Sequence, residues 1–231
     1  LTVASDGTLT LRDGVLLRIA DGVGIDVKGS LDVAEATMQG PGAGARWTGL
    51  LVDGDVETDV TLRGARVLEA SPAFRHHGAG HVQMTSTTLA RSSGADPLIE
   101  VLPGASGALD LVDVTLRDAG GACMRAQGPN LELTVNGLLF DGCGDEAAWW
   151  RNLDVVASNL TVGAGSGAGV HLYGVRGSVD GVNASMHDGA GASMHVQDID
   201  DDFRLTDLTL VAGQGTAAFT GGPNRALDVD G

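Results

Sequence analysis

The sequence predicts an all-β fold, a right-handed parallel β-helix of about nine or ten coils. Three observations lead to this prediction: a short phrase repeats about every 24 residues, a Gly-rich corner follows its later copies, and no stretch has the pattern of an amphipathic helix. A fixed period of one turn plus short strands is typical of a single-stranded solenoid, in which each coil packs only on its neighbours. Equivalent strands of adjacent coils are then expected to stack roughly 4.8 Å apart.

The repeated phrase is a turn-prone residue followed by an apolar residue, any residue and a second apolar residue. Its seven copies begin 22, 27, 24, 22, 24 and 24 residues apart, with the lead residues Gly64, Ser86, Asp113, Gly137, Asn159, Asn183 and Asp207. Gly, Asn and Asp reach left-handed backbone angles at low cost, so we expect a tight turn at each lead residue. The alternation that follows predicts a strand with one buried face.

Each of the last five copies is followed by a Gly-rich corner and then by a second apolar run. The corners cover 118–121, 141–144, 163–167, 188–191 and 212–215, and the runs cover 122–125, 147–150, 169–173, 192–195 and 217–219. A third apolar stretch precedes the lead residue, as in Leu109–Leu111 and Leu131–Leu133. Each coil is therefore expected to contribute three short strands.

The first 80 residues follow the same scheme less regularly. Two segments, 38–46 and 72–80, are interpreted as loops that leave the coil, while strand-like alternation is found at 8–11, 15–19, 24–27 and 30–33. Because strand patterns resume directly after both loops, neither loop marks a domain boundary. We predict one domain over residues 1–231, with less regular coils in 1–80 and regular coils in 81–221.

The chain is strongly acidic, with 30 Asp and Glu against 14 Lys and Arg, a formal net charge of −16, and Lys28 as its only lysine. Such a charge repels phosphate backbones, so nucleic acid is disfavoured as a partner. No run of about 20 apolar residues predicts a membrane span, and we find no signal peptide. We expect a mature chain, or part of a longer surface protein, that is secreted or at the cell surface. The composition is similar to that of proteins from salt-adapted or marine microbes.

The two cysteines, Cys123 and Cys143, lie in successive coils but about four positions out of phase. A disulfide needs Cα atoms within about 7 Å, and the phase offset argues against such an approach. We favour two small interior residues at the corner, with a disulfide as the alternative.

The repeat phrases from Thr8 to Phe219 resemble those of the parallel β-helix proteins of the pectin-lyase-like superfamily. The resemblance implies the fold more strongly than the function. The superfamily includes polysaccharide lyases, glycoside hydrolases, phage tailspikes and many non-catalytic surface repeats, so a functional prediction has to rest on individual residues.

An enzyme of this superfamily would need a matching catalytic site. Polygalacturonase-like members carry paired aspartates, a Gly-His-Gly and an Arg-x-Lys, none of which occurs here. Pectate-lyase-like members use Ca²⁺-binding acids and an arginine base. Just past the repeat strands lie Arg91, Asp118 and Asp141, which stacking would bring together as a candidate acid/base cluster. We favour the alternative of a solvated corner of alternating charge.

The few aromatic residues indicate a binding surface instead. Only eight Phe, Trp and Tyr occur in the chain, yet the second apolar run of nearby coils contains four of them: Trp149, Trp150, Tyr173 and Phe219. Neighbouring residues of a strand point to opposite faces, so the two tryptophans cannot both be inside. By the same alternation, His171 and Tyr173 are expected outside.

Flat rings beside Arg and His along one face suit a sugar chain, which stacks its C–H faces on rings and hydrogen-bonds at their rims. The candidate ligand-binding residues are therefore Trp149, Trp150, Arg151, His171, Tyr173 and His195. The alternative is that one Trp and Phe219 belong to the core and the other residues are isolated on the surface.

Two segments have weaker metal-binding patterns. His76, His77 and His81 have a suitable spacing, but no carboxylate or Cys is near in sequence, and a solvated loop is favoured. Residues 198–202 form an acidic turn that would suit Ca²⁺, yet the Gly and closing Glu of an EF-hand loop are missing. We expect no cofactor, with Ca²⁺ as the alternative.

We predict a non-catalytic secreted or cell-surface β-helix that binds a polysaccharide or cell-surface glycan, or that serves in adhesion. Two alternatives stay open. One is a polysaccharide lyase or glycoside hydrolase that uses Arg91, Asp118 and Asp141, and the other is a structural stalk segment of a longer surface repeat protein. Convergence of the three charged residues in one groove would favour the enzyme.

Overall fold

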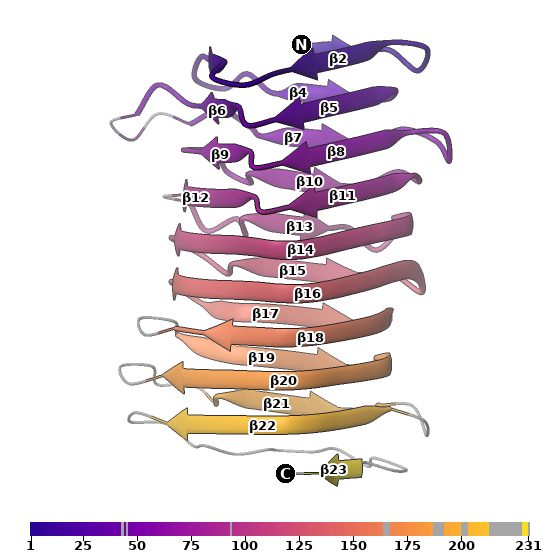
Figure 1. Cartoon of the computed structure of the whole chain (residues 1–231), viewed down its shortest axis with the longest axis vertical. Helices are drawn as coiled ribbons and strands as arrows, with labels where there is room; N and C mark the ends of the chain where they lie inside the picture. The colour runs from indigo at the N-terminus through magenta and orange to yellow at the C-terminus, as the bar shows by residue number, and fades with distance from the viewer. Residues whose placement is uncertain are drawn as a thin grey trace.

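A computed structural model shows a parallel β-solenoid, with coils stacked along its long axis (Figure 1). It describes residues 1–42, 44, 46–92, 94–163, 167–186, 192–199, 203–212 and 228–230. Within these residues all regular structure is strand and no helix occurs. They make about eight turns, one or two fewer than the repeat predicts, at the predicted spacing of roughly 24 residues.

One face of the solenoid is a nine-stranded parallel sheet, to which each coil contributes one short strand. Its strands, in spatial order, are β1 (Thr2–Val3), β4 (Ile25–Val27), β7 (Leu50–Val52), β10 (Phe74–His76), β13 (Ile99–Val101), β15 (Met124–Gln127), β17 (Glu146–Arg151), β19 (Ala168–Tyr173) and β21 (Met194–Gln197). From β15 onward these strands contain the second apolar runs of the sequence. Parallel pairing in register aligns equivalent residues of every coil in columns.

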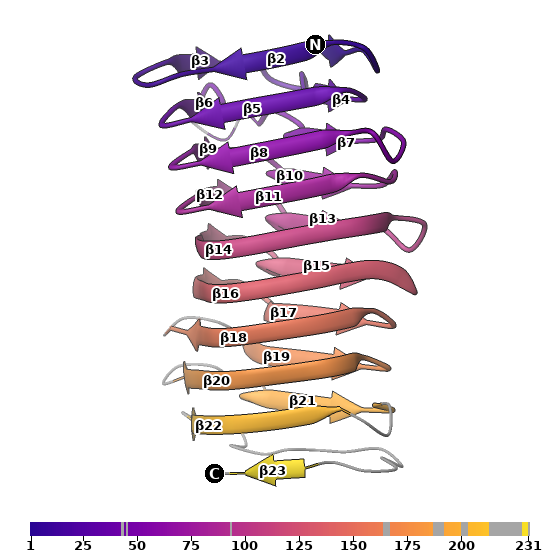
Figure 2. The same cartoon turned by 45° about the vertical axis from the view of Figure 1, so that its right-hand side comes forward.

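The second sheet forms the other two sides of the solenoid (Figure 2). In the N-terminal half each coil supplies two short strands: β2 (Thr8–Leu11), β3 (Leu16–Arg18), β5 (Ser30–Ala34), β6 (Thr37–Gln39), β8 (Asp59–Arg63), β9 (Arg66–Leu68), β11 (His81–Thr85) and β12 (Thr88–Ser92). Further along, the two strands merge into one: β14 (Ser106–Ala119), β16 (Asn130–Cys143), β18 (Asp154–Val162), β20 (Arg176–Met186) and β22 (Arg204–Ala212), followed by β23 (Asp228–Asp230).

A left-handed residue bends this second sheet in each coil. Positive φ values are found at six of the seven predicted lead residues: Gly64, Ser86, Asp113, Gly137, Asn159 and Asp207. The prediction was wrong for the remaining coil, where Gly181 takes the bend with φ 68° and Asn183 pairs with Thr161 inside β20. Val182 and Ala184 are the buried apolar residues that follow Gly181. Residues 181–184 are therefore a second copy of the repeated phrase, which begins two residues before the predicted copy at Asn183. Glu35, with φ 49°, makes the same bend in an earlier coil.

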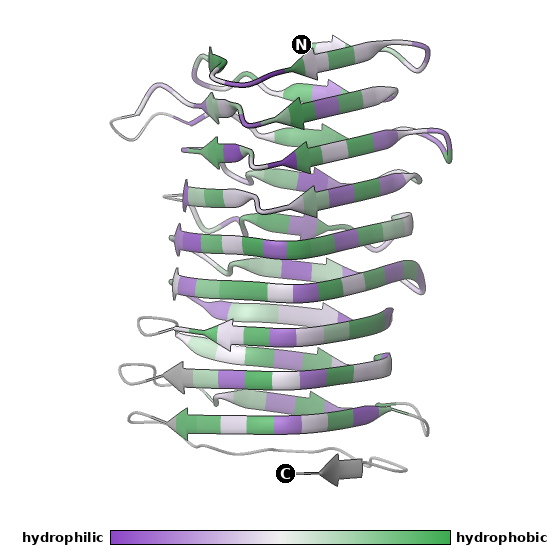
Figure 3. Cartoon of the chain, in the orientation of Figure 1, coloured by the Kyte–Doolittle hydropathy of each residue, from purple (hydrophilic) through white to green (hydrophobic). Residues whose placement is uncertain are grey.

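The core runs through the middle of the solenoid and is built from alternate residues of every strand. Apolar and polar residues alternate along the long strands (Figure 3), and the apolar set is buried. The largest fully buried side chains include Trp47 and Trp150. The Trp47 Nε1–H donates to the carbonyl oxygen of Leu68 at 2.9 Å, which satisfies the one polar group of that ring.

Residues 72–80, expected to form a solvated loop, instead supply β10 of the nine-stranded sheet. β10 pairs in register with β7 and β13, and His76 continues an inward column of valines. His76 is fully buried, and its Nε2–H donates to the carbonyl oxygen of Ser106 at 3.1 Å. Its Nδ1 has no hydrogen-bond partner among the described residues. Burial holds the pKa of His76 below its ordinary value.

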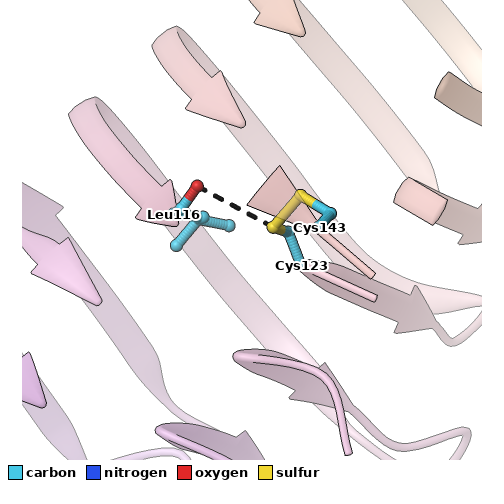
Figure 4. Close-up of a disulfide and its surroundings, with 3 residues drawn as sticks. All are labelled: Leu116, Cys123 and Cys143. Atoms are coloured by element: carbon cyan, nitrogen blue, oxygen red, sulfur yellow. Dashed lines mark hydrogen bonds between the residues drawn. A yellow bond between two sulfur atoms is a disulfide. The ribbon is translucent and has the colours of Figure 1, made fainter. Parts of the chain in front are cut away.

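A disulfide joins Cys123 and Cys143, contrary to our expectation of two unbonded thiols (Figure 4). Cys143 ends β16 and pairs with Ala119, the last residue of β14. The corner that follows Ala119 turns the chain, so that Cys123, four residues later, faces Cys143 with 5.3 Å between the Cα atoms. The four positions by which the two cysteines are out of phase in the sequence are the four residues that the chain needs to turn this corner. Cys123 Sγ also lies 3.8 Å from the carbonyl oxygen of Leu116.

Candidate functional site

The outer face of the nine-stranded sheet carries two columns of polar and aromatic side chains near its C-terminal end. Register places Arg125, Trp149, His171 and His195 in one column, and Gln127, Arg151, Tyr173 and Gln197 in the next. The residues between the two columns point inward and are buried: Ala126, Trp150, Leu172 and Val196. We call the outward set formed by Trp149, Arg151, His171, Tyr173, His195 and Gln197 the aromatic face.

Arg151 lies between the two rings of the aromatic face. Its guanidinium carbon is 4.8 Å from the centre of the Tyr173 ring and 5.9 Å from the centre of the Trp149 ring. Both distances are typical of cation–π contacts, which hold the planar cation without a carboxylate. Within the described part of the chain, Arg151 forms no ion pair, and its buried Nε has no hydrogen-bond partner. The charge of Arg151 is therefore available to a ligand.

The side chains of the aromatic face line an open depression of about 300 Å³. Its lining includes the rings of Trp149 and Tyr173, the guanidinium of Arg151 and the imidazoles of His171 and His195. The two imidazole rings meet edge to face, with 5.3 Å between their centroids. Burial lowers the pKa of His171, and the nearby His195 adds to this effect, while the carboxylates of Glu146 and Asp145 oppose it.

A second depression, of about 220 Å³, lies on the other side of Trp149 and is lined by Arg125, Glu146 and Trp149. Arg125 Nη2 donates to Asp145 Oδ2 at 2.7 Å and to Glu146 Oε2 at 3.0 Å. Burial and the neighbouring Glu146 raise the pKa of Asp145. Burial would also raise the pKa of Glu146, but the hydrogen bonds from Arg125, from its own backbone and from Asp145, with the charge of Arg125, together outweigh it, and the pKa of Glu146 is lowered. The two adjacent carboxyl groups thus differ in how firmly they hold a proton.

The structure brings together five of the six residues that the sequence singled out for ligand binding, namely Trp149, Arg151, His171, Tyr173 and His195. Trp149 and Tyr173 are partly exposed on the same side of the sheet. Trp150 is fully buried, because alternation directs it into the core, and it does not belong to the surface. Its Nε1–H has no hydrogen-bond partner among the described residues.

The three candidate catalytic residues lie at a different corner. Arg91 Nη2 is 3.3 Å from Glu69 Oε1, and Asp118 Oδ2 is 3.9 Å from Arg117 Nε. Asp141 pairs with Arg117 in the sheet, one position away from the column of Asp118. No ion pair within the described residues joins Arg91, Asp118 and Asp141 to one another. Arg91 and Asp118 adopt φ values of 64° and 56°, so both make the left-handed bend of the corner.

The histidines of the predicted metal motif point to different partners. His77 Nδ1 lies 3.0 Å from Asp53 Oδ1, and His81 Nε2 lies 2.8 Å from Asp110 Oδ2, while His76 faces the core. In the described ranges no three His, Cys, Asp or Glu side chains gather in a way that would hold a metal ion. Residues 200–202 of the acidic turn, and Phe219, lie outside the described residues.

Arg125, Asp145, Glu146 and Gln197 were not among the predicted site residues, although they border the same surface. Their signal in the sequence is weak, because a charged pair just before a strand is also typical of an exposed corner. Asp145 and Glu146 reach the surface because the corner after β16 ends next to the outward Arg125 of the preceding coil. Stacking register, and not spacing along the chain, makes this contact.

These features define a class: a parallel β-solenoid, or β-helix, that carries an aromatic and basic surface on one sheet. No family model, curated protein or solved structure matches the chain. Among the described residues there is no helix long and apolar enough to cross a membrane.

Proposed function

We propose that this protein is a non-catalytic β-helix, secreted or displayed on a cell surface, that binds a polysaccharide or cell-surface glycan through the aromatic face. The observation that carries the proposal is Arg151, held between Trp149 and Tyr173 beside an open depression. Sugars offer C–H faces that stack on aromatic rings and hydroxyl groups that bond with polar rims. The aromatic face provides both kinds of contact.

The shape of the surface favours a chain over a compact ligand. The aromatic face extends over β17, β19 and β21, and adjacent strands of a sheet are about 4.8 Å apart, so its ends are separated by about 10 Å. The second depression beside Trp149 continues the same column toward β15. A linear glycan that follows the columns would contact equivalent positions of successive coils.

Two further observations support the proposed location and class. The disulfide between Cys123 and Cys143 is of a kind that persists in oxidising environments, outside the cytosol. The repeat phrases resemble those of the pectin-lyase-like superfamily, and we propose that the chain is a non-catalytic member. The acidic composition would suit a salt-adapted or marine host.

The binding proposal predicts that Trp149→Ala combined with Tyr173→Ala reduces glycan affinity by more than about tenfold. The variant removes both rings that hold Arg151 and opens the wall of the depression. Because both side chains point outward, the midpoint of thermal unfolding should hardly change. A glycan array identifies the ligand, and calorimetric titration with the best oligosaccharide measures the affinity of each variant.

Leu51→Ala is the matched control, since Leu51 occupies the same outward column four coils before Trp149 and outside the aromatic face. It should leave the affinity unchanged. Equal affinity of the wild type and the double variant would remove the binding proposal. A double variant that unfolds at a much lower temperature would show instead that the rings act as packing.

The carboxylates beside Trp149 favour one alternative, a polysaccharide lyase or glycoside hydrolase. Asp145 holds its proton to higher pH and would serve as an acid, while the ionised Glu146 would serve as a base. The same glycan screen, scored for shortened chains, tests this alternative. Cleavage that is lost in Asp145→Asn would establish an enzyme, and intact glycans after prolonged incubation would remove it.

A further inference from the structure

The aromatic face contains two histidines in direct contact, His171 of β19 and His195 of β21. Both line the depression that also holds the guanidinium of Arg151. Histidine is the side chain whose charge ordinarily changes between about pH 5 and pH 8. The charge of this surface therefore depends on pH, whereas that of Arg151 does not.

The other charged groups around the histidines come from neighbouring strands and one corner. β15 contributes Arg125, the corner before β17 contributes Asp145, and β17 contributes Glu146 and Arg151. The remaining polar side chains of the depression, Tyr173 of β19 and Gln197 of β21, are uncharged near neutral pH. Within the described residues a further carboxylate, Asp198, accepts a hydrogen bond from Gln197 Nε2 at 3.5 Å. Protonation of the histidines makes the surface more cationic.

A doubly charged histidine pair would add to the positive charge of the depression. Two imidazolium rings at a centroid distance of 5.3 Å repel each other, and Arg151 adds a third positive charge in the same depression. Burial acts in the same direction at His171, whose pKa is lowered. A negative group placed in the depression would remove this repulsion, so anion binding and proton uptake are expected to favour each other.

We propose that His171 and His195 form a pH-dependent anion subsite beside Arg151, which binds a negatively charged group of the glycan more tightly as the pH falls. The inference rests on the proposed glycan-binding function and adds to it the charge of the ligand and its pH dependence. A carboxylate of a uronic acid and a sulfate ester both have the required charge and hydrogen-bond acceptors.

The test measures the affinity of the full chain, by calorimetric titration at about pH 7.5 and about pH 5, for three oligosaccharides of equal length. One is neutral, one is sulfated and one is built of uronic acid. The sulfated probe stays ionised at both pH values, so any change in its affinity reports protonation of the protein. We expect its affinity to rise about tenfold or more at the lower pH, and that of the neutral probe to stay constant.

His171→Gln combined with His195→Gln should flatten this dependence to less than about twofold. Arg151→Gln should weaken binding of the charged probes at both pH values. His77→Gln is the matched control, because His77 lies outside the depression and pairs with Asp53. Circular dichroism and thermal unfolding of each variant establish that the solenoid is intact.

The outcomes separate this inference from the function on which it rests. Binding of charged probes that is equal at both pH values, or a pH dependence that persists in the double variant, overturns the subsite and leaves glycan binding in place. Equal affinity for neutral and charged probes also overturns it. A protein that binds none of the glycans at either pH overturns the proposed function and the subsite together. Preference for the sulfated or for the uronic probe identifies the source of the anion.

Discussion

His76 occupies an inward position of β10, where an imidazolium would lose most of its hydration. Its Nε2–H is bound to Ser106, but the lone pair of Nδ1 faces the interior without a partner among the described residues. The neutral ring fits this position, and a second proton on Nδ1 would place an uncompensated charge in the core. The lowered pKa of His76 expresses this cost.

This position predicts that the free energy of unfolding falls as the pH drops below about 6.5, the ordinary pKa of histidine. The folded state binds the proton less readily than the unfolded chain, so the contribution of neutral His76 is complete above that pH and is lost toward the lowered pKa. Denaturant titrations at several pH values measure the effect. The slope from one group is at most about 1.4 kcal/mol per pH unit.

His76→Leu removes the titrating group and keeps an apolar side chain in the column. The difference in stability between wild type and variant should shrink or reverse as the pH falls, because the wild type alone loses stability through this group. A constant difference between about pH 8 and pH 5 would show that His76 does not contribute to the pH dependence.

At the scale of elements, each coil is shaped by residues with left-handed backbone angles. They bend the second sheet at Asn159 and Gly181, and they also make the corner at Arg91 and Asp118. Asn and Asp tolerate these angles, so their amide and acidic side chains recur at the bends for a structural reason. Two of the three candidate catalytic residues, Arg91 and Asp118, lie at such positions.

Asn159 and Asn183 provide a matched pair of substitutions within one chain. Asn159 has φ 56°, whereas Asn183 is exposed in the middle of β20. Asn159→Val should cost about 1–3 kcal/mol, because a β-branched residue is forced into the left-handed region. Asn183→Val should cost less than about 0.5 kcal/mol, since Val suits an exposed strand.

Chemical denaturation of both variants under the same conditions decides the point. Equal losses would mean that the bend is not where the structure places it. A larger loss at Asn183 would restore the bend that the sequence alone predicted.

For the whole molecule, the pairing of each coil with the next provides most of the stability. The disulfide between Cys123 and Cys143 differs from these non-covalent contacts, because it joins adjacent coils covalently at a corner. It lies next to β15 and β17, the strands that carry Arg125 and Trp149. The cross-link therefore stabilises the part of the solenoid that supports the aromatic face.

Cys123→Ala combined with Cys143→Ala is expected to lower the free energy of unfolding by about 3 kcal/mol, because the disulfide closes a loop with a sequence separation of 20 residues. Thermal and denaturant unfolding measure the loss. Reductant should lower the free energy of unfolding of the wild type to about that of the variant, and it should leave the stability of the variant unchanged. If reductant does not lower the stability of the wild type even when it is added under unfolding conditions that expose both cysteines, the two cysteines are not bonded.

Much of the fold was predictable from the sequence, because alternation and turn residues act locally. The aromatic face was predictable for the same reason, since Val170 and Leu172 inside require His171 and Tyr173 outside. The bend at Gly181 was missed because two copies of the phrase, two residues apart, satisfy the same alternation. Only the pairing of β20 with β18 distinguishes them.

The sequence by itself determined the solenoid and its period. It also determined that Arg151, Tyr173 and one of the two tryptophans, Trp149 or Trp150, point outward. Each of these features depends on residues close together in the chain. The tertiary structure alone decided which tryptophan is buried, that Cys123 reaches Cys143 around a corner, and that Arg125 meets Asp145 and Glu146. These contacts join residues about 20 positions apart. Their geometry is set by the stacking of coils and the length of each corner, which a one-dimensional pattern does not contain.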